Sequence, residues 1–190
     1  MPYSLIPRTI AVFAQPAVYA VSARLFVLTT DRLGSSQFKP TVATFYETGL
    51  VTSLYEHLLM SPTLAHLDIR HEMPFPGIAG RPKPVDLWLR PANGGFAHCV
   101  EAGDFGVRKA HADAAKLRKI NPKGSNWFLA FFRGRAEALD PCATLDASFQ
   151  RANKLNHKIV EFDKHLTSSF KVYCLNGVHD SFGYSLLKII

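Results

Sequence analysis

Residues 85–103 read VDLWLRPANGGFAHCVEAG, and this stretch decides the fold. Two apolar runs of strand character are separated by Pro, Asn and Gly, a pattern typical of a β-hairpin. Because side chains alternate across a strand, Asp86 points opposite to Leu87, and Glu101 points opposite to Val100. A carboxylate in a strand suited to burial is costly unless it is paired or binds a cation. Two of them on neighbouring strands indicate the start of a site for a hard cation, since Mg²⁺ and its relatives prefer carboxylate oxygen and water.

Length and composition limit the class of protein. The chain has 190 residues, of which 47% are hydrophobic, enough for one domain with a substantial core. Its formal net charge of +7 favours an anionic partner, nucleic acid first and a membrane surface second, although a basic surface that aids solubility gives the same charge. Cys99, Cys142 and Cys174 show no CxxC spacing, and their odd number argues against a complete disulfide framework.

The remaining pattern predicts an α/β fold with a central mixed β-sheet flanked by helices. We expect a single domain over 1–190, because the sequence has no internal repeat and no convincing boundary between domains. The expected helices span 16–29, 40–60, 108–120 and 143–166. Besides the hairpin, strands are expected at 65–73, 127–132 and 170–175.

Both ends of the chain are apolar. Residues 9–23 loosely resemble a secretory signal, but Gln15 and Pro16 interrupt the run, so we expect a helix that packs on the domain and begins at Pro16. No uninterrupted apolar stretch is long enough for a membrane span, and we expect a cytoplasmic protein. The apolar tail 184–190 either completes the sheet or core, or docks on a protein partner or on a second copy in a homodimer.

A third carboxylate, Glu47, lies on the helix expected at 40–60. It falls on the same helical stripe as Val51 and Leu54, whereas Glu56 lies on the opposite face and is expected in solvent. Glu47 therefore points toward the edge of the core. There a carboxylate either belongs to a site or interacts with the dipole at the helix N-terminus.

The order of these residues resembles the PD-(D/E)XK nuclease superfamily, which has a restriction-endonuclease-like fold. The matching pieces are Glu47 on a leading helix, Asp86 on a strand, Glu101 at the end of the next strand, and then a helix and another apolar strand. The resemblance covers a nuclease-like core at about 42–132, with an N-terminal helical extension and a C-terminal helix–strand extension. It implies that Asp86 and Glu101 bind Mg²⁺ or Mn²⁺ beside a scissile phosphate and that Glu47 is an auxiliary ligand.

One position departs from that family's pattern. The superfamily has a lysine two residues after the glutamate, and this chain has Gly103 there. The lysine would hold or activate the attacking water and offset charge on the phosphate, which a glycine does not do. Three interpretations stay open: Lys109 or Lys116 on the next helix replaces it, the protein is a degenerate nuclease that still binds nucleic acid, or Gly103 is a substitution that disarms the chain.

Basic residues gather around the predicted site. We expect them to contact the phosphate backbone of DNA in preference to RNA, although an ordinary solvated surface is the alternative for each one. Two precede the hairpin and four lie on or just after the helix that follows it, namely Arg81, Lys83, Arg108, Arg118, Lys119 and Lys123.

Taken with the resemblance, the residues predict a magnesium-dependent endonuclease that hydrolyses DNA phosphodiester bonds. Its expected catalytic residues are Glu47, Asp86, Glu101, Lys109 and Lys116. The alternative is a catalytically degenerate protein of the same fold that binds nucleic acid or a protein partner.

Overall fold

The structure is a computed structural model that describes residues 5–30, 42–74, 84–104, 107–133, 159–161, 168–173 and 179–190. Its helices are α1 (Leu5–Thr30), α2 (Val42–Leu59), the short 3-10 helix η2 (Pro62–Leu64) and α3 (Val107–Ile120). Its strands are β1 (Leu67–Met73), β2 (Val85–Pro91), β3 (His98–Asp104), β4 (Ser125–Arg133), β5 (Ile159–Glu161), β6 (Ser168–Tyr173) and β7 (His179–Ile189).

The strands in these ranges form one seven-stranded mixed sheet. Its order is β1-β2-β3-β4-β7-β5, and β6 pairs with the N-terminal part of β7. Strands β3 and β4 are parallel, with Glu101 opposite Phe128, and α3 supplies the crossover that a parallel pair needs. The other neighbouring pairs are antiparallel. The predicted α/β class with a mixed sheet is therefore confirmed.

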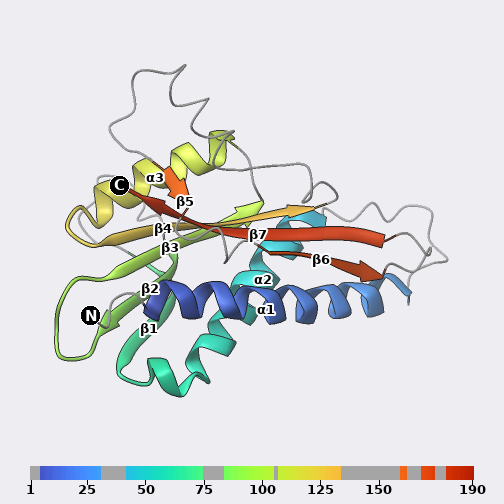
Figure 1. The fold of residues 1–190 in the computed structure, drawn as a ribbon, viewed down its shortest axis with the longest axis horizontal. Helices are drawn as coiled ribbons and strands as arrows, with labels where there is room; N and C mark the ends of the chain where they lie inside the picture. Colours follow the sequence, from blue (N-terminus) through green and yellow to red (C-terminus); the bar gives the residue numbers. More distant parts are fainter. Residues whose placement is uncertain are drawn as a thin grey trace.

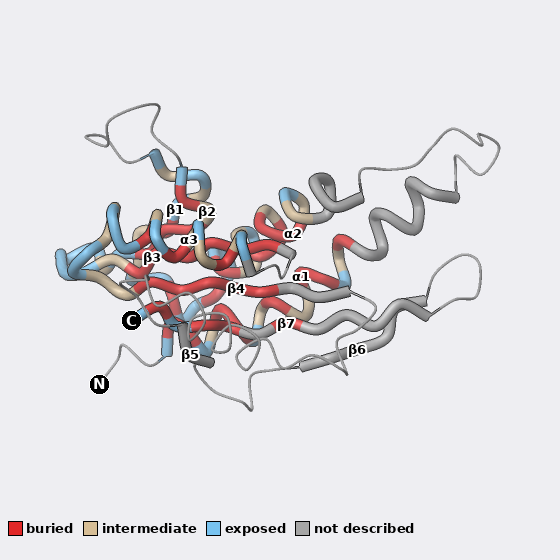
Figure 2. The backbone as a smooth tube through the Cα atoms, turned by 90° about the horizontal axis from the view of Figure 1, so that it is seen from above, coloured by how far each residue is buried: buried red, intermediate tan, exposed pale blue. Residues whose placement is uncertain are grey.

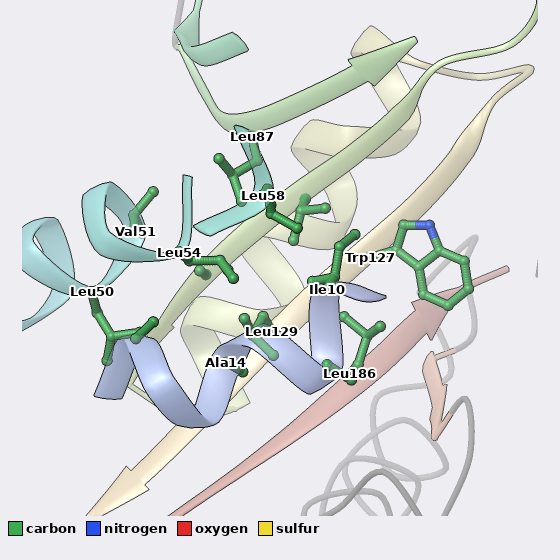
Figure 3. Close-up of a cluster of buried hydrophobic side chains, with 14 of the residues drawn as sticks. Ile10, Ala14, Leu50, Val51, Leu54, Leu58, Leu87, Trp127, Leu129 and Leu186 are labelled. Carbon is green, nitrogen blue, oxygen red and sulfur yellow. The ribbon is translucent and has the colours of Figure 1, made fainter. Parts of the chain in front are cut away.

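Helices cover both faces of the sheet, with α1 and α2 on one face and α3 on the other (Figure 1). Under α1 and α2 lies a large apolar cluster to which both helices and five strands contribute (Figure 3), including Ile10, Ala14, Leu54, Leu58, Leu87, Val100, Leu129 and Leu186. Under α3 lies a second cluster, formed by Trp88, Cys99, Phe128, Ala130, Leu187 and Ile189 from the sheet and by Ala110, Ala114 and Leu117 from the helix. Buried residues continue along β4 between the two layers (Figure 2). Alternation along the strands thus separates two cores.

The first helix corrects one prediction. It begins at Leu5, so Pro16 lies inside α1 and not in its first turn. A proline removes one helical hydrogen bond, but the buried positions Ile6, Ile10, Ala17 and Val21 continue on both sides of it. Burial of this face outweighs the local cost. In the part of the chain that is described, no helix combines the length and apolar character needed to cross a membrane.

The C-terminal region corrects another prediction. Residues 159–161 lie within the range expected to be helical, 143–166, and they form β5, paired with β7 from Ile159↔Ile189 to Glu161↔Leu187. The rest of that range lies outside the described residues. The reason is a tertiary contact, because in the extended conformation this segment forms backbone hydrogen bonds with β7. The apolar tail belongs to β7, and Tyr184, Leu186 and Leu187 are buried, so the tail completes the sheet.

Candidate active site

The hairpin places Asp86 and Glu101 on adjacent strands. The pairing of β2 with β3 runs to Leu87↔Val100, and Asp86 and Glu101 are the next residue along each strand. By alternation both face α3, and the charge of Asp86 raises the pKa of Glu101. Asp86 Oδ2 accepts a hydrogen bond from the backbone N–H of Ala102, 2.7 Å away. The structure thus places both acids on adjacent antiparallel strands and on the same face of the sheet, as alternation predicts.

Lys116 contacts the chain segments that carry both acids. Its Nζ lies 2.5 Å from Oε1 of Glu101, which is 5% exposed. The same ammonium donates a hydrogen bond to the backbone oxygen of Pro84, also 2.5 Å away. The contact with Glu101 is an ion pair with a buried carboxylate oxygen, and the Lys116 ammonium lowers the pKa of Glu101 against the larger effect of burial.

Lys109 lies beside Gly103. Its ammonium forms an ion pair with the carboxylate of Glu47 from α2. A Cβ atom added at Gly103 would lie only 2.7 Å from Cε of Lys109 and 3.0 Å from Cδ of Glu47, with the Lys109 ammonium closer still. The space where a side chain at position 103 would begin is thus filled by Lys109 and Glu47. Glycine is the residue that permits this approach.

Asp113 joins the same group of charges, although the sequence suggests for it only a local pairing with Lys116 within the helix and no place in the site. Its charge interacts with Lys109, Lys116, Asp86 and Glu47, and its Oδ2 is buried without a hydrogen-bond partner. Helical spacing could have indicated that Asp113 belongs to this cluster. Asp113 follows Lys109 by four residues and precedes Lys116 by three, so all three share one face of α3.

Burial shifts the protonation of the acids in this cluster. It raises the pKa of Glu101 to about 8, with a further rise from the nearby charge of Asp86. Burial also raises the pKa of Asp86, against the opposing effects of the Ala102 N–H and the two lysines. The pKa of Asp113 is raised to about 6, again mainly by burial. In each case removal from water disfavours the charged form.

The charges of the cluster suit a divalent cation. When all six groups are ionised, four carboxylates face two ammonium groups, a formal excess of two negative charges. Within the described ranges, no three His, Cys, Asp or Glu side chains converge as a complete metal-ligand set. Mg²⁺ is commonly held by one or two carboxylates together with waters and substrate phosphates. Asp86 and Glu101 fit that smaller requirement.

The six basic residues predicted to contact DNA divide into two groups. Arg108, Arg118, Lys119 and Lys123 are exposed on or just after α3, whereas Arg81 and Lys83 lie outside the described residues. Lys109 and Lys116, predicted as catalytic residues, point toward the acids. Glu56 is exposed on α2, as expected from its helical position.

Comparison with known proteins adds no relative: no protein-family model, no curated protein and no solved structure matches the chain.

Proposed function

We propose that this protein is a metal-dependent nuclease of the PD-(D/E)XK type that hydrolyses DNA phosphodiester bonds. The observation that carries the proposal is the position of Lys109. Its ammonium fills the space next to Gly103, the position where the superfamily pattern has its lysine. A lysine from α3 therefore takes the place of the missing side chain, beside the two acids of the hairpin.

Each residue of the cluster then has a role. Asp86 and Glu101 would hold one Mg²⁺ or Mn²⁺, which supplies a Lewis acid for the phosphoryl oxygen and favours ionisation of water. Glu47 orients the Lys109 ammonium through their ion pair. Lys109 offsets negative charge on the phosphate and holds the attacking water, as a positioned cation does in phosphoryl transfer. Arg108, Arg118, Lys119 and Lys123 bind the DNA backbone without reading its sequence.

Divalent-dependent cleavage of plasmid and linear duplex DNA tests the proposal. We expect cleavage with Mg²⁺ or Mn²⁺ that is lost in Asp86→Ala. Asp68→Ala is the matched control, because Asp68 lies on the neighbouring strand β1, is partly exposed and pairs with Arg70. Full cleavage by the Asp86 variant would remove the site from consideration.

The position of the lysine has its own test. Lys109→Met is expected to lose cleavage, and the double variant Gly103→Lys with Lys109→Met is expected to regain part of it. The second change removes the Lys109 ammonium, which is the closest of the atoms that a side chain at 103 would meet; the flexible ends of the side chains at 109 and 47 must still move aside. If the double variant is as inactive as Lys109→Met while it folds and binds Mn²⁺ normally, the assignment of Lys109 fails.

The degenerate-nuclease alternative makes a different prediction for the same assays. It expects salt-sensitive DNA binding with no cleavage under any divalent ion. The engagement of both lysines in ion pairs with carboxylates is the observation that favours it.

A further inference from the structure

Lys116 differs from Lys109 in what its ammonium touches. Lys109 pairs with Glu47 on α2, whereas Lys116 reaches a carboxylate oxygen of Glu101 and the backbone oxygen of Pro84, both at 2.5 Å. Pro84 lies two residues before Asp86. The Lys116 ammonium therefore lies between the two strand segments that carry the proposed metal ligands.

The oxygens around this ammonium are of the kind that a hard cation uses. Carboxylate and backbone carbonyl oxygens are typical ligands of Mg²⁺, Mn²⁺ and Ca²⁺. Glu101 is 5% exposed, so its ionised form needs a positive partner close by. In the metal-free protein Lys116, whose side chain is 18% exposed, supplies that charge. Its contact with Oε1 is an ion pair, so another cation can take its place at that oxygen.

From this geometry we infer that Lys116 is an internal counter-ion at the proposed metal site, and that a divalent cation displaces its ammonium from Glu101 on binding. The inference rests on the proposed function, because it takes Asp86 and Glu101 as ligands. Once displaced, the Lys116 ammonium remains at the site and is available to a phosphate group. Binding of the cation thereby frees a positive charge for the substrate.

Mn²⁺ titration followed by electron paramagnetic resonance, without DNA, tests the inference. We expect Lys116→Met to bind Mn²⁺ about tenfold more tightly than the wild type, because it removes a like charge in contact with a ligand oxygen. Lys109→Met is the matched control: it removes the same charge from the same helix but not from Glu101, and its effect should be smaller. Equal effects of the two substitutions would overturn the displacement and leave only a general charge effect.

Amine labelling of the wild-type protein provides a second measurement that needs no substitution of a lysine. Labelling of Lys116 by a small amine reagent, read by peptide mass spectrometry, should rise when Mn²⁺ is added, while the exposed Lys123 stays constant. In Asp86→Asn the rise should disappear with the metal site. Unchanged labelling of Lys116 in a protein that binds Mn²⁺ through Asp86 would overturn the inference and leave the proposed function standing. Absence of Mn²⁺ binding at Asp86 would overturn both.

Discussion

The two faces of the sheet bury different kinds of side chain. On the α1/α2 face the fully buried side chains are mainly aliphatic, such as Ile10, Leu54 and Leu129. On the α3 face the helix presents Ala110 and Ala114 to the sheet, and charged groups fill the space at its edge. Small residues let α3 lie close to the strands, so that its lysines reach the acids. One face is thus built for packing and the other for holding charge.

This difference separates stability from function. Apolar burial contributes favourably to folding, whereas a buried carboxylate opposes it unless a charge compensates. The pKa values of Glu101 and Asp113 are raised because burial disfavours their charged forms. A cost of this kind, concentrated at one edge of one face, is typical of sites that bind a ligand.

The largest effect on stability is expected from Leu54→Ala on the α1/α2 face. Leu54 is fully buried in the large cluster (Figure 3), and truncation of such a leucine leaves a cavity that costs about 2–5 kcal/mol. Urea unfolding gives the free energy. Leu59→Ala, on the same helix but 52% exposed, should cost far less. Equal losses in the two variants would contradict the assignment of this face as the packing core.

Low pH should destabilise the fold through His98, which lies on the α1/α2 face. Its ring is buried, and burial lowers its pKa to about 4. The Trp127 indole N–H donates to its Nδ1 at 3.3 Å, which requires a neutral ring. A histidine whose pKa is lowered by folding stabilises the fold at pH values above the pKa that it has in the unfolded chain, near 6.5. This stabilising contribution is lost as the pH falls toward 4.

His98→Gln keeps an acceptor for the indole and removes the titration. Relative to this variant, the wild type should lose up to about 3 kcal/mol of unfolding free energy as the pH falls from 6.5 to 4. Urea unfolding at a series of pH values measures the difference. A constant difference between the two proteins over this range would refute the role of His98.

The α3 face should respond to pH in the opposite direction. Glu101 has its pKa raised from 4.5 to about 8, so its contribution to stability is greatest below pH 4.5 and declines as the pH rises toward 8. Glu101→Gln removes that decline, and should be more stable than the wild type near pH 8 by on the order of 1 kcal/mol or more. The exposed Glu56→Gln is the control for loss of charge. An advantage of Glu101→Gln that does not grow with pH would contradict this account.

Local pattern predicted the α3 face better than the chain ends. The hairpin, the facing of Asp86 and Glu101 and the helix that follows depend on alternation and helical period, which the sequence carries directly. The position of Lys109 beside Gly103 depends on how closely α3 approaches β3, a distance that spacing along the chain does not contain. The sequence does not place Asp113 in the site for the same reason, although helical spacing puts it on the same face of α3 as Lys109 and Lys116.

The wrong predictions have a common cause. Local signals in the sequence predict a helix start at Pro16 and a helix over 159–161. In the fold, continuous burial along α1 and pairing of β5 with β7 outweigh those signals. Tertiary contacts of this kind override local propensity by supplying burial or hydrogen bonds that the isolated segment lacks.

The smallest expected effect concerns the exposed surface of α3. It compares the two faces by the effect of their exposed charges on DNA binding. Arg118→Ala and Lys119→Ala remove exposed charges and should each weaken DNA binding modestly, about equally for different sequences, and lower the salt dependence by roughly one unit of slope per phosphate contact. Arg8→Ala, an exposed arginine of α1 on the opposite face, is the matched control. Fluorescence anisotropy with a labelled duplex over a range of salt concentrations measures both quantities. If Arg8→Ala changes the slope as much as the α3 variants do, DNA binding follows the net charge of the whole protein and not the α3 face.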